Sequence, residues 1–473
     1  MADTPPSPHI VVVSSPGIGH VTPLAELTKL LVLRHHFTAT IVTFSDLPTC
    51  SLPSSISTLQ LPLLPPHSLP PHTHFVTRIC LAMTHSIPFL REILISVTRT
   101  TRLAAVFFDL FGIYFLSMGK SGIPTYLLIT SNLFYLSFML HLPALAATTT
   151  AGEFRDLPEP LNLPGCVPLK GKDFLEPLQE RNSEVCAGVI HRARHFDLFD
   201  GILVNSFEAL EPGAAMFLKN RGGGTPPVWP IGPLIWSDSN VGSEKPSHEC
   251  IEWLDKQSSG SVVFLCFGSG GALSWQQTRE LAIGLEMSGQ RFLWVVRGVS
   301  DIGSSDSFLN PNHGEDEDDD PLRFLPKGFV ERIKGRGMVV RSWAPQREVL
   351  SHFAVGGFVS HCGWNSTLES LMNGVPMAAW PLYSEQRMNA VLLVDGVKVA
   401  LRVNVGEDGT VGREEIAKVV KMLMEGEEGK VVRQKMREMK TEAAIAEGKQ
   451  GSSHNALKEV VSILKDSDSA KPK

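Results

Sequence analysis

Continuous apolar runs recur along the chain and alternate with stretches whose apolar residues follow a helical period. The run 9–14 (HIVVVS) has the character of a strand buried on both faces of a parallel sheet. A glycine-containing turn, SPGIGH, leads into a helical pattern that places Leu24, Leu27 and Leu31 on one face. The run 39–44 (ATIVTF) is typical of a second strand, so this segment predicts one β-α-β unit.

The same alternation continues through the rest of the chain. It implies parallel sheets covered by helices on both faces, an α/β fold. At 473 residues the chain exceeds what one hydrophobic core usually organises, so we expect two such halves with a cleft between them. Ligands of these sheets bind at the carboxyl ends of the strands. Further strands are expected at 104–108, 124–129, 201–205, 261–267, 292–297, 338–341, 357–360 and 377–380, with helices at 275–288 and 366–373.

A change of composition between residues 231 and 248 marks the expected boundary between the halves. Gly, Pro, Ser and Asn dominate this stretch (IGPLIWSDSNVGSEKPSH), as they do in interdomain linkers. We therefore assign a first Rossmann-like domain to 1–238, a linker to 239–250 and a second Rossmann-like domain to 251–455. The final segment, 456–473, is expected to be a helix that packs back toward the first domain, followed by a tail.

Composition narrows the function classes. A net charge of −6 argues against nucleic acid or an anionic membrane surface as a partner. The longest apolar stretch, 123–142, contains Pro124 and His141, so we expect a buried strand and a helix there and no membrane insertion. Seven widely spaced cysteines without a CxxC pair fit buried thiols in a reducing compartment. With no secretory signal and no coiled-coil pattern, a cytoplasmic monomer is expected.

The most informative stretch runs from Trp343 to Gln386. Within it, 357–360 reads as a strand, HCGWNS (361–366) as a turn, and Thr367 as the start of a short helix. The free backbone N–H groups of a helix N-terminus, with Asn365 and Ser366 as further donors, suit a diphosphate.

Side chains around this turn suit the other parts of a nucleotide sugar. Glu369, one turn into the helix, can accept from two vicinal hydroxyls of a ribose. Trp343 offers a flat face on which a base can stack. Glu385 and Gln386, beyond the strand that ends at Trp380, supply an acceptor and a mixed donor and acceptor for sugar hydroxyls.

This stretch resembles the signature box of plant secondary-product glycosyltransferases, the UDP-dependent glycosyltransferases of small molecules. It spans the 44 positions 343–386 of that box without a gap. The remaining chain is consistent with the family, including PGIGH and the stretch 109–112 (DLFG). Within the family it looks most like the branch that glucosylates phenylpropanoids, monolignols and simple phenols such as hydroquinone.

The resemblance implies two Rossmann-like domains facing across a cleft, the GT-B fold, with the acceptor in the first and the donor in the second. It implies an inverting O-glucosyltransferase that moves glucose from UDP-glucose to a hydroxyl of a small aromatic acceptor, giving a β-glucoside. UDP-glucose is then a co-substrate, and neither a cofactor nor a metal is expected.

The donor-site roles that the resemblance implies fall on the box and on one serine outside it. Gln386 favours glucose, because galactose users of the family often carry His there; Ser384 departs from a common Ala. The expected contacts are Trp343 and Ala344 with uracil, Gln346 and Glu369 with the ribose, Ser269, His361, Asn365 and Ser366 with the diphosphate, and Trp364, Glu385 and Gln386 with the sugar.

His20 and Asp109 form the candidate catalytic pair. Each follows an apolar strand, so both are expected at strand carboxyl ends near the cleft. A carboxylate bonded to one ring nitrogen fixes the tautomer and stabilises the imidazolium formed when the other nitrogen takes a proton. The residues alone leave Asp109 equally open to capping a helix near Gly112. The resemblance favours catalysis, because the family uses a His and an Asp at these positions.

The walls of the acceptor pocket are expected from loops of the first half, since the donor occupies the second. They are apolar side chains that lie after strands. The candidates are Ile18, Phe111, Tyr114, Phe134, Leu140 and Phe174.

Three alternatives compete with this interpretation. The acidic stretch 301–320 contains a DxD match, Asp316 to Asp318, which could hold a metal; a solvated surface loop explains it better. A nicotinamide-dependent oxidoreductase is suggested by PGIGH and Asp46, but Thr22 stands where the third glycine of that motif belongs. A non-catalytic protein that binds UDP-sugar or phenol is disfavoured by the presence of both His20 and Asp109.

Overall fold

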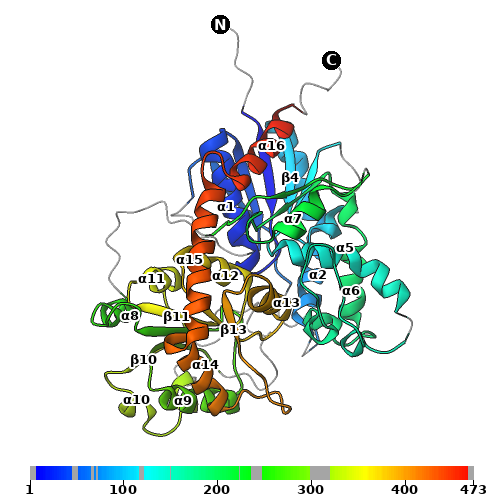
Figure 1. The fold of residues 1–473 in the computed structure, drawn as a ribbon. Helices are drawn as coiled ribbons and strands as arrows, with labels where there is room; N and C mark the ends of the chain where they lie inside the picture. The colour runs from blue at the N-terminus through cyan, green and yellow to red at the C-terminus, as the bar shows by residue number, and fades with distance from the viewer. Residues whose placement is uncertain are drawn as a thin grey trace.

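The computed structural model describes residues 7–44, 52–64, 69–70, 73–116, 122–149, 151–222, 224–235, 248–298 and 320–466. Two parallel sheets form separate layers of the molecule (Figure 1). The first has seven strands in the order β3-β2-β1-β4-β5-β6-β7. Its strands are β1 His9–Val13, β2 Thr38–Thr43, β3 Ile56–Gln60, β4 Leu103–Phe108, β5 Thr125–Ile129, β6 Gly201–Val204 and β7 Val228–Pro230.

The second sheet has six strands in the order β10-β9-β8-β11-β12-β13, again all parallel. Its central strands are buried along their length because helices cover both faces. The strands are β8 Val262–Cys266, β9 Arg291–Val296, β10 Gly337–Arg341, β11 Val355–Ser360, β12 Met377–Ala379 and β13 Ala400–Arg402.

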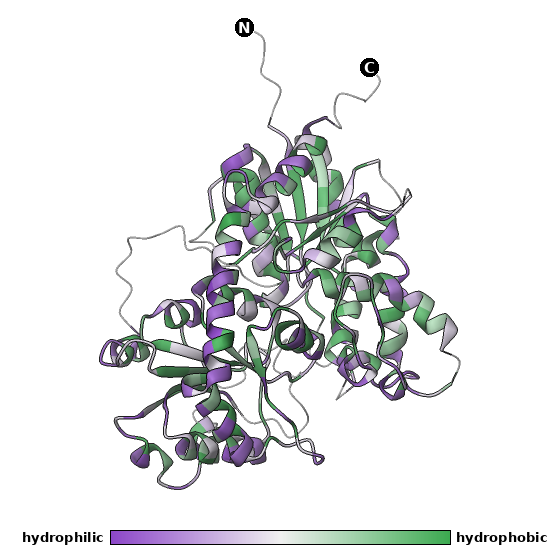
Figure 2. Cartoon of the chain, viewed as in Figure 1, coloured by the Kyte–Doolittle hydropathy of each residue, from purple (hydrophilic) through white to green (hydrophobic). Residues whose placement is uncertain are grey.

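Helices connect and cover the strands of both sheets. Hydrophobic residues predominate along the strands, whereas hydrophilic residues are frequent along outer helices such as the long α15 (Figure 2). The helices are α1 Ile18–His35, α2 Phe75–His85, α3 Ile87–Thr100, α4 Ile113–Leu116, α5 Leu133–Thr148, α6 Glu184–Ala193, α7 Pro212–Lys219, α8 Glu249–Leu254, α9 Trp275–Ser288, α10 Phe329–Arg332, α11 Gln346–Ser351, α12 Trp364–Asn373, α13 Gln386–Val391, α14 Arg413–Glu425, α15 Glu427–Glu447 and α16 Ser452–Asp466.

Every strand expected from the apolar runs is present, and the doubly covered α/β fold is confirmed. Three strands gave no such signal. β3 carries the half-exposed sequence ISTLQ at the edge of its sheet, and β7 and β13 are only three residues long. Helix α12 begins at Trp364, three residues earlier than the expected Thr367. The stretch 123–142 forms buried β5 and the start of α5.

The carboxyl-terminal helices join the second sheet to the first. The long helix α15 packs on α12 and β13, and α16 contacts β4 and β7 of the first sheet (Figure 1). Leu457, Val460, Val461 and Leu464 of α16 enter the core under β1 and β4. Ser453 Oγ also donates to the carbonyl of Gly232, 2.6 Å away. The expected linker 239–250 lies largely outside the described residues, so the domain boundary stays a prediction.

The cysteines and the apolar helices can also be placed. Within the described ranges, Cys80, Cys166, Cys186, Cys250, Cys266 and Cys362 are free thiols. In the same ranges no single helix has both the length and the apolar character needed to cross a membrane. One bent pair, α2 with α3, meets that test by length and composition together, with a bend of 48°.

Candidate active site

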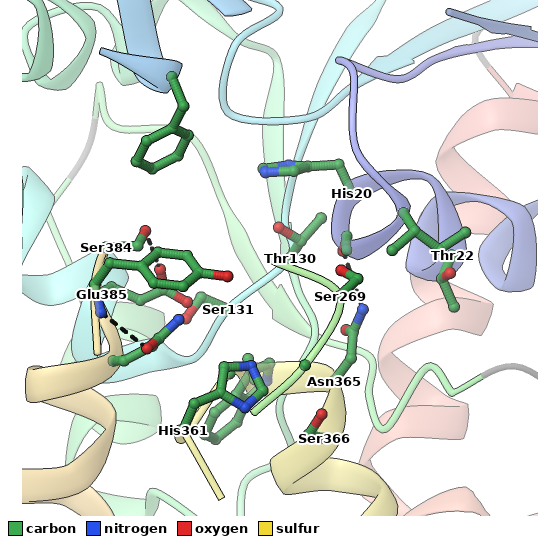
Figure 3. Close-up of a pocket in the computed structure, with 18 of the residues that line it drawn as sticks. His20, Thr22, Thr130, Ser131, Ser269, His361, Asn365, Ser366, Ser384 and Glu385 are labelled. Atoms are coloured by element: carbon green, nitrogen blue, oxygen red, sulfur yellow. Dashed lines mark hydrogen bonds between the residues drawn. The ribbon is translucent and has the colours of Figure 1, made fainter. Parts of the chain in front are cut away.

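A cavity of about 400 Å³ opens between the carboxyl ends of the two sheets. Both halves of the chain line it: His20, Thr130 and Ser131 come from the first, and His361 and Glu385 are among those from the second (Figure 3). Every residue expected at the donor site lines this cavity. They are Ser269, Trp343, Ala344, Gln346, His361, Trp364, Asn365, Ser366, Glu369, Glu385 and Gln386.

His20 and Asp109 meet at the first-half side of the cavity. His20 lies in the first turn of α1, and its Nδ1 is 3.3 Å from Oδ2 of Asp109. The contact has ion-pair distance but lacks the alignment of a hydrogen bond. Asp109 is fully buried behind the ring, while His20 retains some exposure and lines the cavity. The ring therefore keeps Nε2 for a ligand.

The Asp109 carboxylate also holds the surrounding backbone. Its Oδ2 accepts from the N–H of Ser15 at 2.8 Å and from the Ser15 hydroxyl. Its Oδ1 accepts from the N–H of Phe111 at 3.0 Å, so Asp109 also caps the turn before α4. The catalytic and capping interpretations are thus compatible, because different oxygen lone pairs serve each contact.

His361 is packed between two glycines at the start of α12. A Cβ on Gly268 or on Gly363 would lie 2.4 Å from Nε2 of His361, so only glycine permits this approach. Gly268 also has a φ of +78°, which glycine adopts without strain. Burial lowers the pKa of His361 to about 4. The ring is therefore neutral near pH 7, with one donor and one acceptor nitrogen, and it hydrogen-bonds with the backbone of Cys266.

Several hydrogen bonds join the two halves beside the cavity, among them three made by side-chain amides or an indole. Trp364 Nε1–H donates to the carbonyl of Asn205 at 2.6 Å, and the amide of Asn365 donates to the carbonyl of Gly19 at 3.1 Å. The amide of Asn132 donates to Oδ1 of Asn389 at 2.7 Å. The first two bonds are made by side chains expected to touch the donor. The same residues that would hold the donor therefore also set the width of the cleft.

A second group of the residues expected at the donor site is linked in one hydrogen-bond network. Gln346 Nε2 donates to Oε2 of Glu369 at 2.6 Å and to Oγ of Ser366 at 2.9 Å. Burial raises the pKa of Glu369. Trp343 is 63% exposed, an unusual degree for tryptophan, and its neighbour Ser342 has a φ of +59°. An indole left open at the mouth of a cavity can stack a planar ligand.

Glu385 and Gln386 lie where α13 begins. Ser384 Oγ donates to Oε2 of Glu385 at 2.7 Å, an orienting bond that alanine could not make (Figure 3). Gln386 is buried, and its Oε1 accepts from the backbone N–H groups of Leu382 and Tyr383. The amide nitrogen of Gln386 is therefore the part that faces a ligand.

The expected acceptor walls are corrected in part. Ile18 and Phe111 line the cavity, with the Phe111 ring edge-on to the His20 ring at 5.6 Å between centroids. Phe134 and Phe174 are buried in the core, where Phe174 packs on Phe138 and Phe154, because helix α5 turns this apolar face inward. The other two also lie outside the lining: Leu140, packed against the core, and Tyr114, which borders Cys80 and Arg192.

Other lining residues gave no clear sequence signal. Most of the apolar wall comes from the amphipathic helix α2 and from α5 and α6, which carry no motif. Arg297 could have been found, because it ends the expected strand 292–297, directly follows β9 and so lies at a carboxyl end. The residues missed include Phe75, Val76, Ile79, Thr130, Ser131, Tyr135, Val189, Arg192 and Arg297.

The described ranges hold no group of three or more His, Cys, Asp or Glu side chains that could bind a metal ion. The DxD match, like Asp46, lies outside the described residues. Asp320, the end of that acidic stretch, pairs with Arg341 at 3.2 Å. Chemically, the cavity combines a base backed by a carboxylate on one side with a helix N-terminus and polar side chains on the other.

Comparison with known proteins agrees with this geometry. Residues 233–438 match the model of the UDP-glucoronosyl and UDP-glucosyl transferase family. The chain is 48% identical to hydroquinone glucosyltransferase of Rauvolfia serpentina, over 96% of this chain and 97% of that protein. Among solved structures, Phytolacca americana UGT2 with UDP-2-fluoro-glucose and pterostilbene has a TM-score of 0.86 at 46% identity, covering 97% and 100% of the chains. A Polygonum tinctorium UDP-glucosyltransferase that glucosylates indoxyl, in complex with 3,4-dichloroaniline, has a TM-score of 0.88 at 42% identity, covering 98% and 100%.

Proposed function

The chain belongs to the UDP-glucuronosyl and UDP-glucosyl transferase family and is a UDP-dependent glycosyltransferase of the GT-B fold, and from this we propose its substrates and mechanism. It transfers glucose from UDP-glucose to a hydroxyl of a small aromatic acceptor. The named activity of the Rauvolfia relative and the ligands of the Phytolacca structure support this choice of donor and acceptor.

His20 is the general base of the proposed reaction. Its Nε2 takes the proton of the acceptor hydroxyl while the hydroxyl oxygen forms a bond to the anomeric carbon of glucose. The bond from that carbon to the UDP oxygen breaks in the same step, and UDP leaves with the electron pair. Asp109, 3.3 Å from Nδ1, stabilises the imidazolium that forms.

The donor side supplies stabilisation of the leaving diphosphate. The first residues of α12 line the cavity, so its free N–H groups are close enough to receive a diphosphate, and the side chains of Ser269, Asn365 and His361 lie around them. Such preoriented donors stabilise the negative charge that develops on the leaving group. Trp343 stacks on the base, and Glu369, held by Gln346, accepts from the ribose.

The proposed product is the β-glucoside. Among the described lining residues the carboxylates are Glu369 and Glu385, and both are held by hydrogen bonds from neighbouring side chains. In the proposed arrangement Glu369 accepts from the ribose and Glu385 from the sugar hydroxyls, which leaves no lining carboxylate in the role of nucleophile. A single displacement from the α-linked donor therefore inverts the anomeric carbon.

The observation that carries the proposal is the meeting of His20 and Asp109 with the α12 N-terminus in one cavity. The test is turnover of UDP-glucose with hydroquinone, with the anomeric configuration read by proton NMR. We expect a β-glucoside and release of UDP. Binding of UDP and phenol without product would support a non-catalytic binding protein instead, and an α-glucoside would overturn the single displacement.

We also propose that the protein works as a cytoplasmic monomer. Free thiols at all six described cysteines support a reducing compartment. A fluorescent fusion in plant cells and light scattering of the purified protein test the two parts separately.

A further inference from the structure

Arg192 is a buried cation in the first-half wall of the cavity. It lies in α6 and is only 3% exposed, yet it lines the cavity together with Val189, one turn earlier on the same helix face. Arginine keeps its positive charge inside proteins, and burying such a charge without a counterion is costly.

Its contacts in the described part of the chain do not neutralise this charge. Nη1 donates to Sγ of Cys80 at 3.2 Å, and the guanidinium carbon lies 4.8 Å from the centre of the Phe111 ring. A thiol sulfur is a weak acceptor. Nε donates to no group, and no described carboxylate forms an ion pair with Arg192. The phenol of Tyr114 also hydrogen-bonds with Arg192, but burial raises the pKa of that phenol, which keeps it neutral, so it supplies no counter-charge.

The cation is close to the proposed base. The Phe111 ring contacts both groups, with the His20 ring centroid 5.6 Å from its own and the Arg192 carbon 4.8 Å away on its face. The guanidinium carbon and the imidazole ring therefore lie at most about 10 Å apart. A benzene ring, alone or with a short side chain, spans such a gap from its hydroxyl to a carboxylate at its other end.

We propose that Arg192 binds a carboxylate of the acceptor, so that phenolic acids are preferred acceptors and receive glucose on the ring hydroxyl. This inference rests on the proposed function. The guanidinium donates two parallel hydrogen bonds to the carboxylate, and this orientation places the hydroxyl at the opposite end of the ring near His20. Because the carboxylate is held away from the base, the product is the phenolic glucoside and not the glucose ester.

The test compares 4-hydroxybenzoate with its methyl ester and with hydroquinone, in the wild type and in Arg192→Met. We expect Arg192→Met to lower kcat/KM for the acid by about 10- to 100-fold relative to the ester, the range for losing a charged hydrogen bond. The effect of the substitution on kcat/KM for the acid is divided by its effect on kcat/KM for the ester, so differences in acidity between the two phenols cancel. Arg192→Lys keeps part of the acid preference. Arg194→Gln, on the exposed side of the same helix end, removes the same charge and leaves the ratio unchanged.

Two further measurements separate a binding role from a structural one. The melting temperature of ligand-free Arg192→Met is expected to equal or exceed that of the wild type, because a buried unpaired charge is removed. Equal losses for acid, ester and hydroquinone with a lowered melting temperature would show a structural arginine and overturn the inference.

Calorimetry with UDP present measures acid and ester binding without turnover. A wild type that binds the acid more tightly but glucosylates none of the three phenols would sink the proposed function and leave only the binding of the carboxylate by Arg192 standing. Equal affinity of the wild type for acid and ester would overturn the inference alone. A product that alkali hydrolyses is the glucose ester. Such a product would show transfer to the carboxyl group and would also contradict the inference.

Discussion

Oδ2 of Asp109 faces two different partners, the imidazole of His20 at 3.3 Å and the backbone N–H of Ser15 at 2.8 Å. The second contact anchors the carboxylate to the end of β1, so its position does not depend on the histidine. The two residues can therefore be tested separately, because replacing His20 leaves the buried contact between Asp109 and Ser15 intact.

Replacing His20 with alanine should lower kcat with ordinary phenols by about 10²- to 10⁴-fold, the usual contribution of general-base catalysis. Phenols with a pKa near 10 are protonated at pH 7 and need a base. The loss should shrink with nitrophenols or trichlorophenol, which ionise without help, while UDP affinity stays near wild type. Equal losses with acidic and ordinary phenols, or a loss of UDP affinity, would remove His20 from the role of base.

Asp109→Asn should reduce kcat less than His20→Ala, because the imidazole remains in place. It should also destabilise the fold by about 1–3 kcal/mol, since an amide cannot accept from both Ser15 and Phe111 with its nitrogen facing one of them. Urea unfolding measures this cost, and His20→Ala is the matched control with an unchanged midpoint. An unfolding midpoint that stays at the wild-type value would contradict the anchoring role.

Gln386→His should shift donor use from UDP-glucose toward UDP-galactose. The Gln386 carboxamide is fixed through Oε1 by two backbone N–H groups, so its nitrogen addresses the sugar from one position. An imidazole places its donor differently. The ratio of kcat/KM for the two donors is the measurement. An unchanged preference for glucose would show that this side chain does not contact the sugar.

Removing divalent metal should leave activity unchanged. The α12 N-terminus with Ser269 and Asn365 provides the charge stabilisation that a metal supplies elsewhere. Turnover in excess EDTA, compared with the same enzyme plus manganese, tests this. Activity lost with chelator and restored by manganese would point instead to the acidic stretch 301–320.

Stability should fall as the pH is lowered from about 6.5 to 4, partly through His361. Its folded pKa of about 4 lies below the ordinary value, so in this window the unfolded chain binds a proton that the folded chain excludes. Each pH unit then costs up to about 1.4 kcal/mol, and the effect ends below pH 4, where both states are protonated. Above pH 6.5 the imidazole is neutral in both the folded and the unfolded chain, so no stability is lost through His361.

His361→Asn removes this proton, so its unfolding free energy should depend less steeply on pH in the same window. His141→Asn, on the exposed face of α5, serves as the control and should keep the wild-type slope. The same slope in all three proteins would show that His361 is accessible to protons in the folded state.

The sequence by itself determined the two parallel sheets and the residues of the second half that line the cavity. Buried parallel strands are apolar on both faces. Runs such as 9–13 and 262–266 can therefore be predicted as strands from the local sequence, without knowing which strands lie beside them. The residues from Trp343 to Gln386 are close in sequence because one strand-turn-helix and the segment after it carry them, and local structure alone brings them together.

Only the tertiary structure decided which apolar residues of the first half line the cavity. Helix α5 is apolar all round, so its pattern could not distinguish buried Phe134 from Tyr135, which lines the cavity. Arg192 had no motif, and its burial beside Phe111 follows from packing of α6 against helices far away in sequence. The apolar character of a side chain predicts that it will be buried away from water. Which cavity it lines depends on contacts between elements distant in sequence, and a local pattern does not contain that information.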